Sequence, residues 1–491
     1  MNDPDTELVA PGLPTRIPVP TAPSIDRITE QRAIGALVGS TVGDALGARF
    51  EFGPPGAYRR EFPEPVLGGI GEMVGGGPFP WRPGEFTDDT QMAVALAESL
   101  LARGGFDADD VWRRWRAWSA TATDVGVLTR RVLVADDWRS AAESAHRANG
   151  GLSAANGALM RVTGLAVAYA FGEPDELTHV ARAQAALTHH DPAAGWGAAI
   201  GAQLVRAGIL GGDPLAVVDE LVAALPDDVR APFAEVLDPG WDPTAPGAVS
   251  SGTVWGCLGR AMWALRRSGS FAEAVVEAID LGGDTDTVAA VTGAIAGAKY
   301  SVQGIPCRWT TYLNGTVDGP DGGQAYDNDS LQSLARRLMG KAAVPATPPE
   351  SPAGPVRVAP RLHAADLGGA RDVPPDWAVV SLCRTDGWFA RHPVRREVYL
   401  IDQPAPSNAA LGEMVADVVD SIDALLAEGR EVVVHCHGGR SRTGLVLKAW
   451  AMRHYGVDER GAHDWLASKW YRYDDYEPSF VELLRGSWSQ R

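Results

Sequence analysis

The sequence contains few cysteines and no long apolar run. Its four cysteines, Cys257, Cys307, Cys383 and Cys436, are widely spaced among 491 residues, which excludes a disulfide framework and a clustered zinc site. This cysteine usage favours a reducing cytoplasm. No apolar stretch is long enough to span a bilayer, and the acidic, proline-rich start lacks the basic and apolar parts of a secretory signal. We therefore expect a cytoplasmic protein with no membrane partner.

The chain also lacks an excess of positive charge. Its net charge is −18, and most of this negative charge lies before residue 357. Non-specific binding to nucleic acid depends on neutralising phosphates with lysine and arginine, so an extended nucleic-acid polymer is disfavoured as a partner. A local pocket for a single anion is compatible with the same charge balance.

The length and the sequence pattern predict a multidomain protein, because one core rarely serves 491 residues. Residues 1–25 are predicted to form a disordered tail. Residues 26–340 are rich in alanine and glycine with apolar residues at helical spacing, which predicts an all-α domain. The aperiodic, proline-rich residues 341–356 predict a linker. Residues 357–491 alternate short β-type runs with helices, which predicts an α/β domain with a parallel or mixed sheet.

The stretch "HCHGGRSRTG", residues 435–444, has the pattern of a strand, a glycine-rich loop and a helix. Gly438 and Gly439 permit close backbone approach, and a helix N-terminus binds an oxyanion and favours a thiolate. Arg442 can bind phosphate with two hydrogen bonds, and Cys436 can then attack phosphorus. The alternatives are that Cys436 is a buried cysteine at a strand end, or that His435 and His437 bind a metal.

This stretch resembles the H-C-x-x-G-x-x-R-[ST]-G signature of protein tyrosine and dual-specificity phosphatases, and the resemblance extends over residues 357–491. It implies phosphomonoester hydrolysis through a cysteinyl-phosphate, without a cofactor. The loop residues that would contact phosphate are His437, Gly438, Gly439, Arg440 and Ser441. "YLIDQPAP" resembles the family's general-acid loop, so Asp402 would protonate the leaving group. The alternative is a solvated turn aspartate.

Two further stretches, "EFTDDTQMAVALAESL" and "DLGGDTDTVAAVTGAIAG", place threonine and paired aspartates where a helix begins. Taken singly, each is explained by helix capping. If both ends meet, their carboxylates repel one another unless a cation neutralises them. Oxygen ligands suit Mg²⁺ or Mn²⁺, and two ions would fit four aspartates. The candidate metal ligands are Thr87, Asp88, Asp89, Asp284, Asp286 and Thr287.

These motifs resemble those of the ADP-ribosylglycohydrolase family, which is all-α and holds a binuclear Mg²⁺ or Mn²⁺ centre. The resemblance covers about residues 26–340. "GSTVGDALGARFEF" implies Glu51 as the acid near the metals, although a surface glutamate at a helix end is the alternative. "SAANGALMRV", "LTHHDPAAGWGAA" and "SATATDVGVLTRR" match the family's substrate pocket. They imply as pocket residues Ser153, Asn156, Gly157, Met160, His189, Asp124 and Gly126. For His189, a structural role is the alternative.

The two resemblances together imply a bifunctional hydrolase that releases ADP-ribose and hydrolyses a phosphomonoester. The substrate would be an ADP-ribosylated protein, an ADP-ribosylated nucleic-acid end or a small ADP-ribose derivative. Because a fusion holds two activities at high effective concentration, we hypothesise that the phosphatase acts on phosphorylated ADP-ribose derivatives. The alternatives are one active domain with the other as a binding module, and a scaffold without catalysis. The oligomeric state, the ADP-ribosyl linkage and the choice between the two metals stay open.

Overall fold

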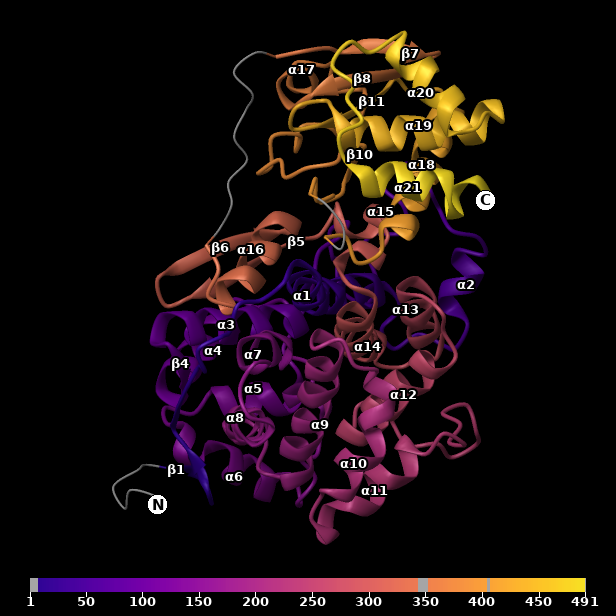
Figure 1. Cartoon of the computed structure of the whole chain (residues 1–491). Coiled ribbons are helices and arrows are strands. Elements are labelled where there is room, and N and C mark those ends of the chain that lie inside the picture. The colour runs from indigo at the N-terminus through magenta and orange to yellow at the C-terminus, as the bar shows by residue number, and fades with distance from the viewer. Residues whose placement is uncertain (1–7, 343–351, 404–406, 491) are drawn as a thin grey trace. The chain divides into compact units, whose positions relative to one another are not determined.

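The computed structural model describes residues 8–342, 352–403 and 407–490, and its internal contacts divide the chain into two units (Figure 1). Unit 1 consists of Met1–Pro63, Gly75–Val302 and Leu313–Ala343. Unit 2 consists of Glu64–Val74, Gln303–Tyr312 and Val344–Arg491. Two short segments from within the predicted all-α region therefore belong to unit 2. Residues 343–351 of the predicted linker lie outside the described residues.

Unit 1 is helix-rich, as predicted. Its α-helices are α1 (Arg27–Gly47), α2 (Ala57–Glu61), α3 (Asp88–Arg103), α4 (Ala108–Ser119), α5 (Val127–Leu133), α6 (Trp138–Ala148), α7 (Thr163–Tyr169), α8 (Pro174–Ala186), α9 (Pro192–Ile209), α10 (Val218–Ala223), α11 (Asp227–Leu237), α12 (Val254–Arg266), α13 (Phe271–Asp280), α14 (Thr285–Tyr300) and α16 (Asn328–Leu338). Helix α1 is buried on all sides from Ala33 to Gly47, which makes it a central core helix.

Helices α1 and α14 pack with their backbones in close contact (Figure 1). Gly39 faces Gly293, and Gly35 faces Gly297. A Cβ atom added at any of these four glycines would overlap a backbone carbonyl oxygen of the other helix. The glycines therefore set the spacing of the two helices, and with it the position of the start of α14, where two of the predicted metal aspartates lie.

The prediction of a disordered tail is wrong for residues 8–18. They form β1 (Leu8–Ala10), β2 (Leu13–Pro14) and β3 (Arg16–Pro18), and β3 pairs with β4 (Gly105–Asp107). Leu13 and Ile17 are buried, and the hydroxyl of Tyr169 donates to the Ile17 carbonyl at 2.6 Å. Two apolar anchors in a proline-rich stretch give no recognisable period, so the sequence pattern missed them. Unit 1 also contains the hairpin β5 (Asn314–Gly319) and β6 (Gly322–Asp327).

Unit 2 has a five-stranded sheet in the order β10-β9-β11-β8-β7. The strands are β7 (Val356–Ala359), β8 (Leu362–Asp366), β9 (Ala378–Ser381), β10 (Arg395–Glu397) and β11 (Val432–Cys436). Strands β8 to β11 are parallel, and β7 is antiparallel to β8. The helices are α15 (Cys307–Thr310), α17 (Leu367–Arg371), α18 (Leu411–Ala427), α19 (Ser441–Tyr455), α20 (Glu459–Ala467) and α21 (Pro478–Arg485). The predicted mixed α/β fold is confirmed.

The segment Gln303–Tyr312 completes the edge of this sheet. The backbone N–H of Arg395 donates to the Tyr312 hydroxyl at 3.0 Å, and that of Glu397 donates to Thr311 Oγ1 at 2.9 Å. These side chains satisfy donors that an edge strand would otherwise leave open. The fully buried Arg396 donates to the Leu67 carbonyl at 2.6 Å, so the other short segment is also an integral part of unit 2.

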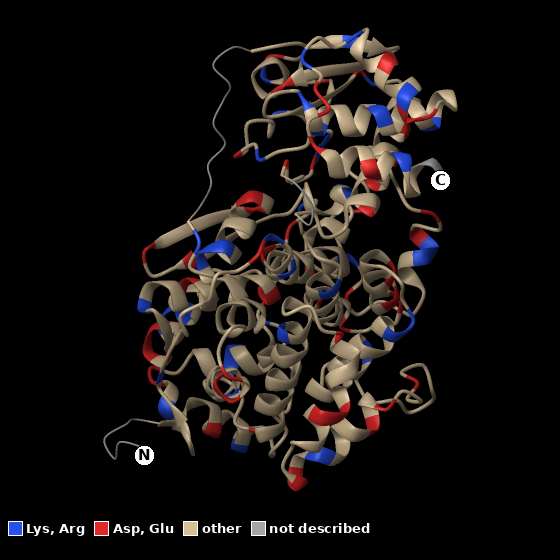
Figure 2. Ribbon diagram, in the orientation of Figure 1, with Lys and Arg blue, Asp and Glu red and all other residues tan. Residues whose placement is uncertain are grey.

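Acidic and basic side chains are spread over many elements of the chain (Figure 2). In the described part of the chain, no helix combines the length and the apolar character that crossing a bilayer requires. All four cysteines are buried and free of disulfides.

Candidate functional sites

Unit 1 contains a cavity of about 820 Å³ between the starts of α3 and α14 and the loops that face them. Its lining brings together every substrate-pocket residue predicted from the sequence, together with Glu51 and the four predicted metal aspartates. Thr287 lines it too, whereas Thr87 does not. Thr87 is buried, and its hydroxyl lies 3.5 Å from Asp89 Oδ2. Thr87 is therefore placed to orient a carboxylate of the cavity.

Carboxylates converge at the base of this cavity. Oxygen atoms of Glu51, Asp284 and Asp286 all lie within 4.8 Å of one another. The hydroxyl of Thr287 donates to Asp89 Oδ2 at 3.2 Å, which joins the start of α14 to the start of α3. The two helix ends, almost two hundred residues apart in the sequence, therefore meet. Neither Thr87 nor Asp284 makes the side-chain capping bond of the alternative interpretation.

The electrostatics of the cluster are compatible with a bound cation. Burial and the charge of Asp124 raise the pKa of both Glu51 and Asp88 to about 8. Burial also raises the pKa of Asp89 and Asp286 well above the usual range. Glu51 Oε2 and Asp89 Oδ1 are buried and accept no hydrogen bond from the described residues. A cation would provide both the missing ligand contacts and the missing positive charge, and oxygen donors of this kind fit Mg²⁺ or Mn²⁺.

The predicted substrate loop lies against this cluster. Asn156, in the 3₁₀ turn Asn156–Ala158, donates from Nδ2 to Asp284 Oδ2 at 2.7 Å. Gly157 packs against His189, since an added Cβ would lie 3.3 Å from His189 Cε1. Burial and the charge of Arg161 lower the pKa of His189 to about 3, so this histidine is neutral. It both lines the cavity and supports the loop.

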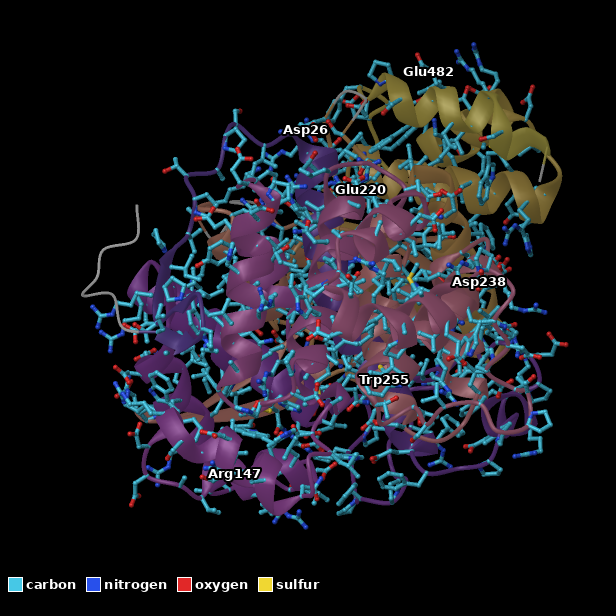
Figure 3. The ribbon with its side chains drawn as sticks, turned by 90° about the horizontal axis from the view of Figure 1, so that it is seen from below. Asp26, Arg147, Glu220, Asp238, Trp255 and Glu482 are labelled. Atoms are coloured by element: carbon cyan, nitrogen blue, oxygen red, sulfur yellow. The ribbon has the colours of Figure 1, made fainter. Side chains whose placement is uncertain are left out.

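Several functional features were not predicted. Asp44 is fully buried in α1 and accepts hydrogen bonds from the backbone N–H groups of Thr87 and Thr90, which fixes the start of α3. The signal for it was an aspartate inside an otherwise apolar helix. Trp255, labelled in Figure 3, lines the cavity from α12, and Phe52 lines it with a left-handed backbone (φ 58°). No sequence pattern distinguished these two aromatic residues.

In unit 2, Cys436 is the last residue of β11, and α19 begins five residues later at Ser441. The strand, loop and helix therefore lie as predicted. Gly439 is left-handed (φ 66°), and an added Cβ would lie 2.9 Å from Trp470 Cζ2, so the loop requires glycine here. Cys436 is buried at the carboxyl end of parallel strands, where open α/β sheets bind their ligands. Of the other loop residues, His437 and Arg440 are exposed.

Asp402 and Arg442 lie together beside this loop. Asp402 Oδ1 accepts a hydrogen bond from Ser441 Oγ at 2.6 Å, and Oδ2 accepts one from the Tyr476 hydroxyl at 2.5 Å. Arg442 Nε lies 3.5 Å from Asp402 Oδ2, and its Nη1 donates to the Leu400 carbonyl at 3.2 Å. The structure therefore places the predicted acid within reach of the predicted phosphate loop, so Asp402 is not a solvated turn residue.

His435 lies behind the loop rather than in it. Its Nε2 is 2.7 Å from the hydroxyl of Ser381 on β9, and the ring is fully buried. Burial lowers its pKa to about 3, so the ring is neutral. These contacts favour a structural role and not the alternative of a metal ligand.

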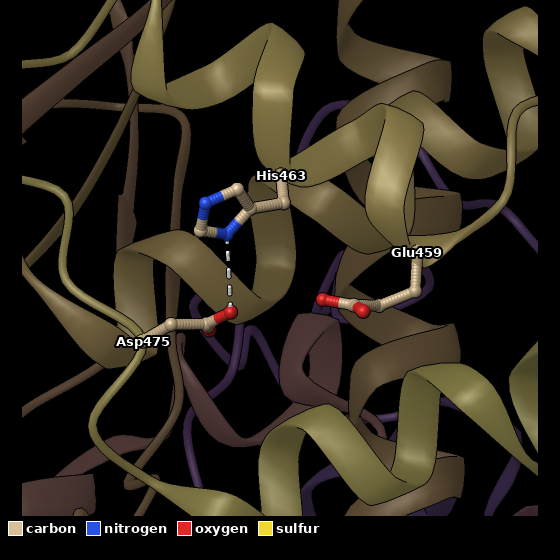
Figure 4. Close-up of side chains that lie close together, drawn as sticks. All are labelled: Glu459, His463 and Asp475. Atoms are coloured by element: carbon tan, nitrogen blue, oxygen red, sulfur yellow. Dashed lines mark hydrogen bonds and ion pairs between the residues drawn. The ribbon is translucent and has the colours of Figure 1, made fainter.

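A second acidic cluster, Glu459, His463 and Asp475, lies in unit 2 (Figure 4). The fully buried ammonium of Lys448 donates to Glu459 Oε1 at 2.9 Å and to Asp475 Oδ2 at 2.7 Å. Arg485 Nε lies 2.8 Å from Glu459 Oε2. These cations already neutralise the carboxylates, so the cluster is an internal ion-pair network that joins α19, α20 and α21.

The helical fold with its acidic cavity and the α/β fold with its cysteine loop define a two-domain hydrolase. Residues 26–348 match the model of the ADP-ribosylglycohydrolase family. Because this match covers more than half of the sequence, the chain belongs to the ADP-ribosylglycohydrolase family. Residues 391–456 match a second model, described as a polymorphic toxin system DSP-PTPase phosphatase, and the chain is an enzyme that carries both hydrolase types.

Individual relatives agree with this assignment. The chain is 30% identical over 299 residues to the ADP-ribosyl-[dinitrogen reductase] glycohydrolase of Rhodospirillum rubrum, which covers 61% of this chain and 94% of that protein. It is 32% identical over 288 residues to the ADP-ribosylarginine hydrolase Tri1 of Pseudomonas putida, which covers 57% and 73% respectively. A solved structure, an ADP-ribosylglycohydrolase-related protein complex, is similar with 35% identity and a TM-score of 0.50, covering 64% of this chain and 98% of that one.

Proposed function

We propose that unit 1 hydrolyses the glycosidic bond at the anomeric carbon of ADP-ribose with two Mg²⁺ or Mn²⁺ ions, and that unit 2 hydrolyses a phosphomonoester through a cysteinyl-phosphate. The observation that carries the first part is the convergence of Glu51, Asp284 and Asp286 within 4.8 Å of one another. The second part is supported by the contact of Asp402 with Ser441 in the cysteine loop.

In unit 1, bound ions would supply positive charge to the ribose hydroxyls and to a water molecule. Asp88, Asp89, Asp284 and Asp286 would hold them. Glu51 is suited to proton transfer, because its raised pKa of about 8 lies near the pH at which it would work. The surplus of carboxylates would also stabilise an oxocarbenium-like transition state. Asn156 would keep Asp284 oriented through its 2.7 Å hydrogen bond.

In unit 2, the Cys436 thiolate would attack phosphorus and displace the ester oxygen, forming an S–P bond as the P–O bond breaks. Arg442 and the loop amides would bind the phosphate oxygens. Asp402 would donate a proton to the leaving oxygen. Water would then hydrolyse the S–P bond, releasing inorganic phosphate and restoring the thiolate. No redox partner is needed for this sequence.

The substrate of unit 1 is proposed to be an ADP-ribosylated protein, an ADP-ribosylated nucleic-acid end or a small ADP-ribose derivative. Two relatives are named for activity on ADP-ribosyl-dinitrogen reductase and on ADP-ribosylarginine, and these names support an ADP-ribosylated protein as the substrate. For unit 2 we propose a phosphomonoester on an ADP-ribose derivative, and the support is the presence of both hydrolase types on one chain.

One set of assays on the full chain tests this proposal. We expect Mg²⁺-dependent release of ADP-ribose from ADP-ribosylated arginine, and EDTA-resistant release of phosphate from p-nitrophenyl phosphate. ADP-ribose-1″-phosphate should be a better phosphate donor than a phosphotyrosine peptide. If the peptide is preferred, the shared-substrate proposal is wrong. If ADP-ribose binds but is never released from a modified substrate, unit 1 is a binding module instead.

A further inference from the structure

The side chain of Gln303 forms hydrogen bonds with residues that come before and after Asp402 in the sequence. Gln303 belongs to unit 2 and is buried. Its Nε2 donates to Asn408 Oδ1 at 2.8 Å and to the Tyr399 carbonyl at 3.4 Å. Its Oε1 accepts from the Ala410 N–H at 3.3 Å. Donor and acceptor of one amide are therefore both used to hold the residues that flank Asp402.

Asn408 extends these contacts to the residue before Asp402. Its Oδ1 accepts from the Ile401 N–H at 3.0 Å, and its Nδ2 donates to the Ile401 carbonyl at 2.9 Å. Both backbone groups of Ile401 are therefore bound by one side chain. Because Asn408 Oδ1 also accepts from Gln303, the amide of Gln303 fixes which way the Asn408 amide is turned. The two amides form a relay that ends one residue from Asp402.

We infer that Gln303 is a positioning residue for Asp402, acting through Asn408 and Ile401. This inference rests on the proposed role of Asp402 as general acid. Ser441 and Tyr476 hold the carboxylate itself, whereas the relay holds the backbone from which that carboxylate projects. Proton transfer requires donor and acceptor within hydrogen-bond reach, and a misplacement of about 1 Å can cost about 100-fold in rate.

Gln303 lies far from the phosphatase signature in the sequence. Gln303 lies more than one hundred residues before Cys436, inside the stretch 26–348 that matches the glycohydrolase family. The phosphatase signature does not contain it. The acid step of unit 2 therefore depends on a residue that the chain contributes from outside its phosphatase-like stretch, and the two hydrolases do not divide cleanly at the linker.

The test uses the full chain with Gln303→Ala and the nearly isosteric Gln303→Glu, which removes the donor to Asn408. Gln203→Ala is the control, because Gln203 is an equally buried glutamine that donates to the Pro174 carbonyl and to Thr178 in unit 1. We measure kcat/KM for phenyl phosphate, whose leaving group needs a proton, and for p-nitrophenyl phosphate, whose leaving group scarcely does. Asp402→Asn is measured alone and combined with Gln303→Glu.

For both Gln303 variants we expect kcat/KM for phenyl phosphate to fall by about 10-fold or more, and that for p-nitrophenyl phosphate to change by less than about 2-fold. Gln203→Ala should change neither, and Gln303→Glu should add nothing to Asp402→Asn. If Gln303→Ala fails to fold, Gln303→Glu carries the test. Equal slowing of both substrates, or an additive double variant, would overturn the inference alone. Equal slowing of both by Asp402→Asn would overturn the proposed acid and the inference with it.

Discussion

At the scale of single residues, the chemistry proposed for unit 1 rests on buried carboxylates that lie close together. Burial and the nearby charge of Asp124 raise the pKa of Glu51 and Asp88 to about 8. These groups ordinarily titrate near pH 4. Without a cation, the folded protein therefore keeps protons on them that the unfolded chain has released, and its stability falls as the pH rises from about 4 to about 8.

This dependence of stability on pH predicts how removing the metal changes the melting temperature. At pH 5 protons neutralise the cluster, so EDTA should lower Tm only slightly. At pH 8 only a cation can neutralise it, so the difference in Tm between Mg²⁺ and EDTA should be larger. Thermal melting at both pH values measures the difference. Asp110 lies on α4, outside the cavity, and pairs with arginines, so the control variant Asp110→Asn should keep the same difference in Tm between Mg²⁺ and EDTA. A difference that shrinks toward pH 8 would contradict the proposed metal centre.

At the scale of elements, helix α14 positions the start of the acidic cluster through its glycine contact with α1. We predict that Gly293→Ala destabilises the protein by about 1–3 kcal/mol, because the added methyl group overlaps the Gly39 carbonyl oxygen and helix backbones cannot yield easily. Chemical denaturation measures this change in the free energy of unfolding.

Gly195→Ala is the matched control for this prediction. Gly195 also lies inside a helix of unit 1, but an added Cβ would lie no closer than 3.5 Å to Arg182. Alanine should be neutral there, or stabilising by about 0.4–1 kcal/mol through the unfolded state. If both alanine variants were equally stable, the close glycine packing would not set the helix spacing.

The elements that carry both sites could be predicted because their signals are local. Helix starts at Asp88 and Thr285, and the strand, loop and helix around Cys436, follow from spacing and residue type within short stretches. The pairing of β3 with β4 and the place of Gln303 in unit 2 could not be predicted. They depend on contacts between residues far apart in the sequence, about which local periodicity carries no information.

Local sequence patterns are limited in the same way for the residues of the two candidate sites. The motifs singled out Glu51, the aspartates and Asp402, and the structure places the first two in one cavity and Asp402 beside the cysteine loop. They did not locate Asp44, Trp255 or Gln303, whose roles arise only from what surrounds them. The sequence marked Asp44 only as an aspartate inside an apolar helix and did not mark Gln303 at all. Their roles therefore become visible only from their contacts in the folded structure.

At the scale of the whole molecule, we propose that one chain contains two chemically independent active sites. One would depend on carboxylates and cations, and the other on a thiolate and an arginine. Their residues come from different units, so a variant at one site should leave the other reaction intact. This holds although Gln303 lies within the stretch matched to the glycohydrolase family and belongs to unit 2.

The most direct test measures both activities of Asp284→Asn and Cys436→Ser in the full chain. Asp284→Asn should lower ADP-ribose release by about 100-fold or more and leave hydrolysis of p-nitrophenyl phosphate unchanged. Cys436→Ser should lower phosphate release by about 10⁴-fold or more while vanadate still raises its Tm, because the loop amides and Arg442 remain. Its ADP-ribose release should match that of the unmodified chain. If either variant lowered both activities in parallel, or left its own activity intact, the account of two independent sites would be contradicted.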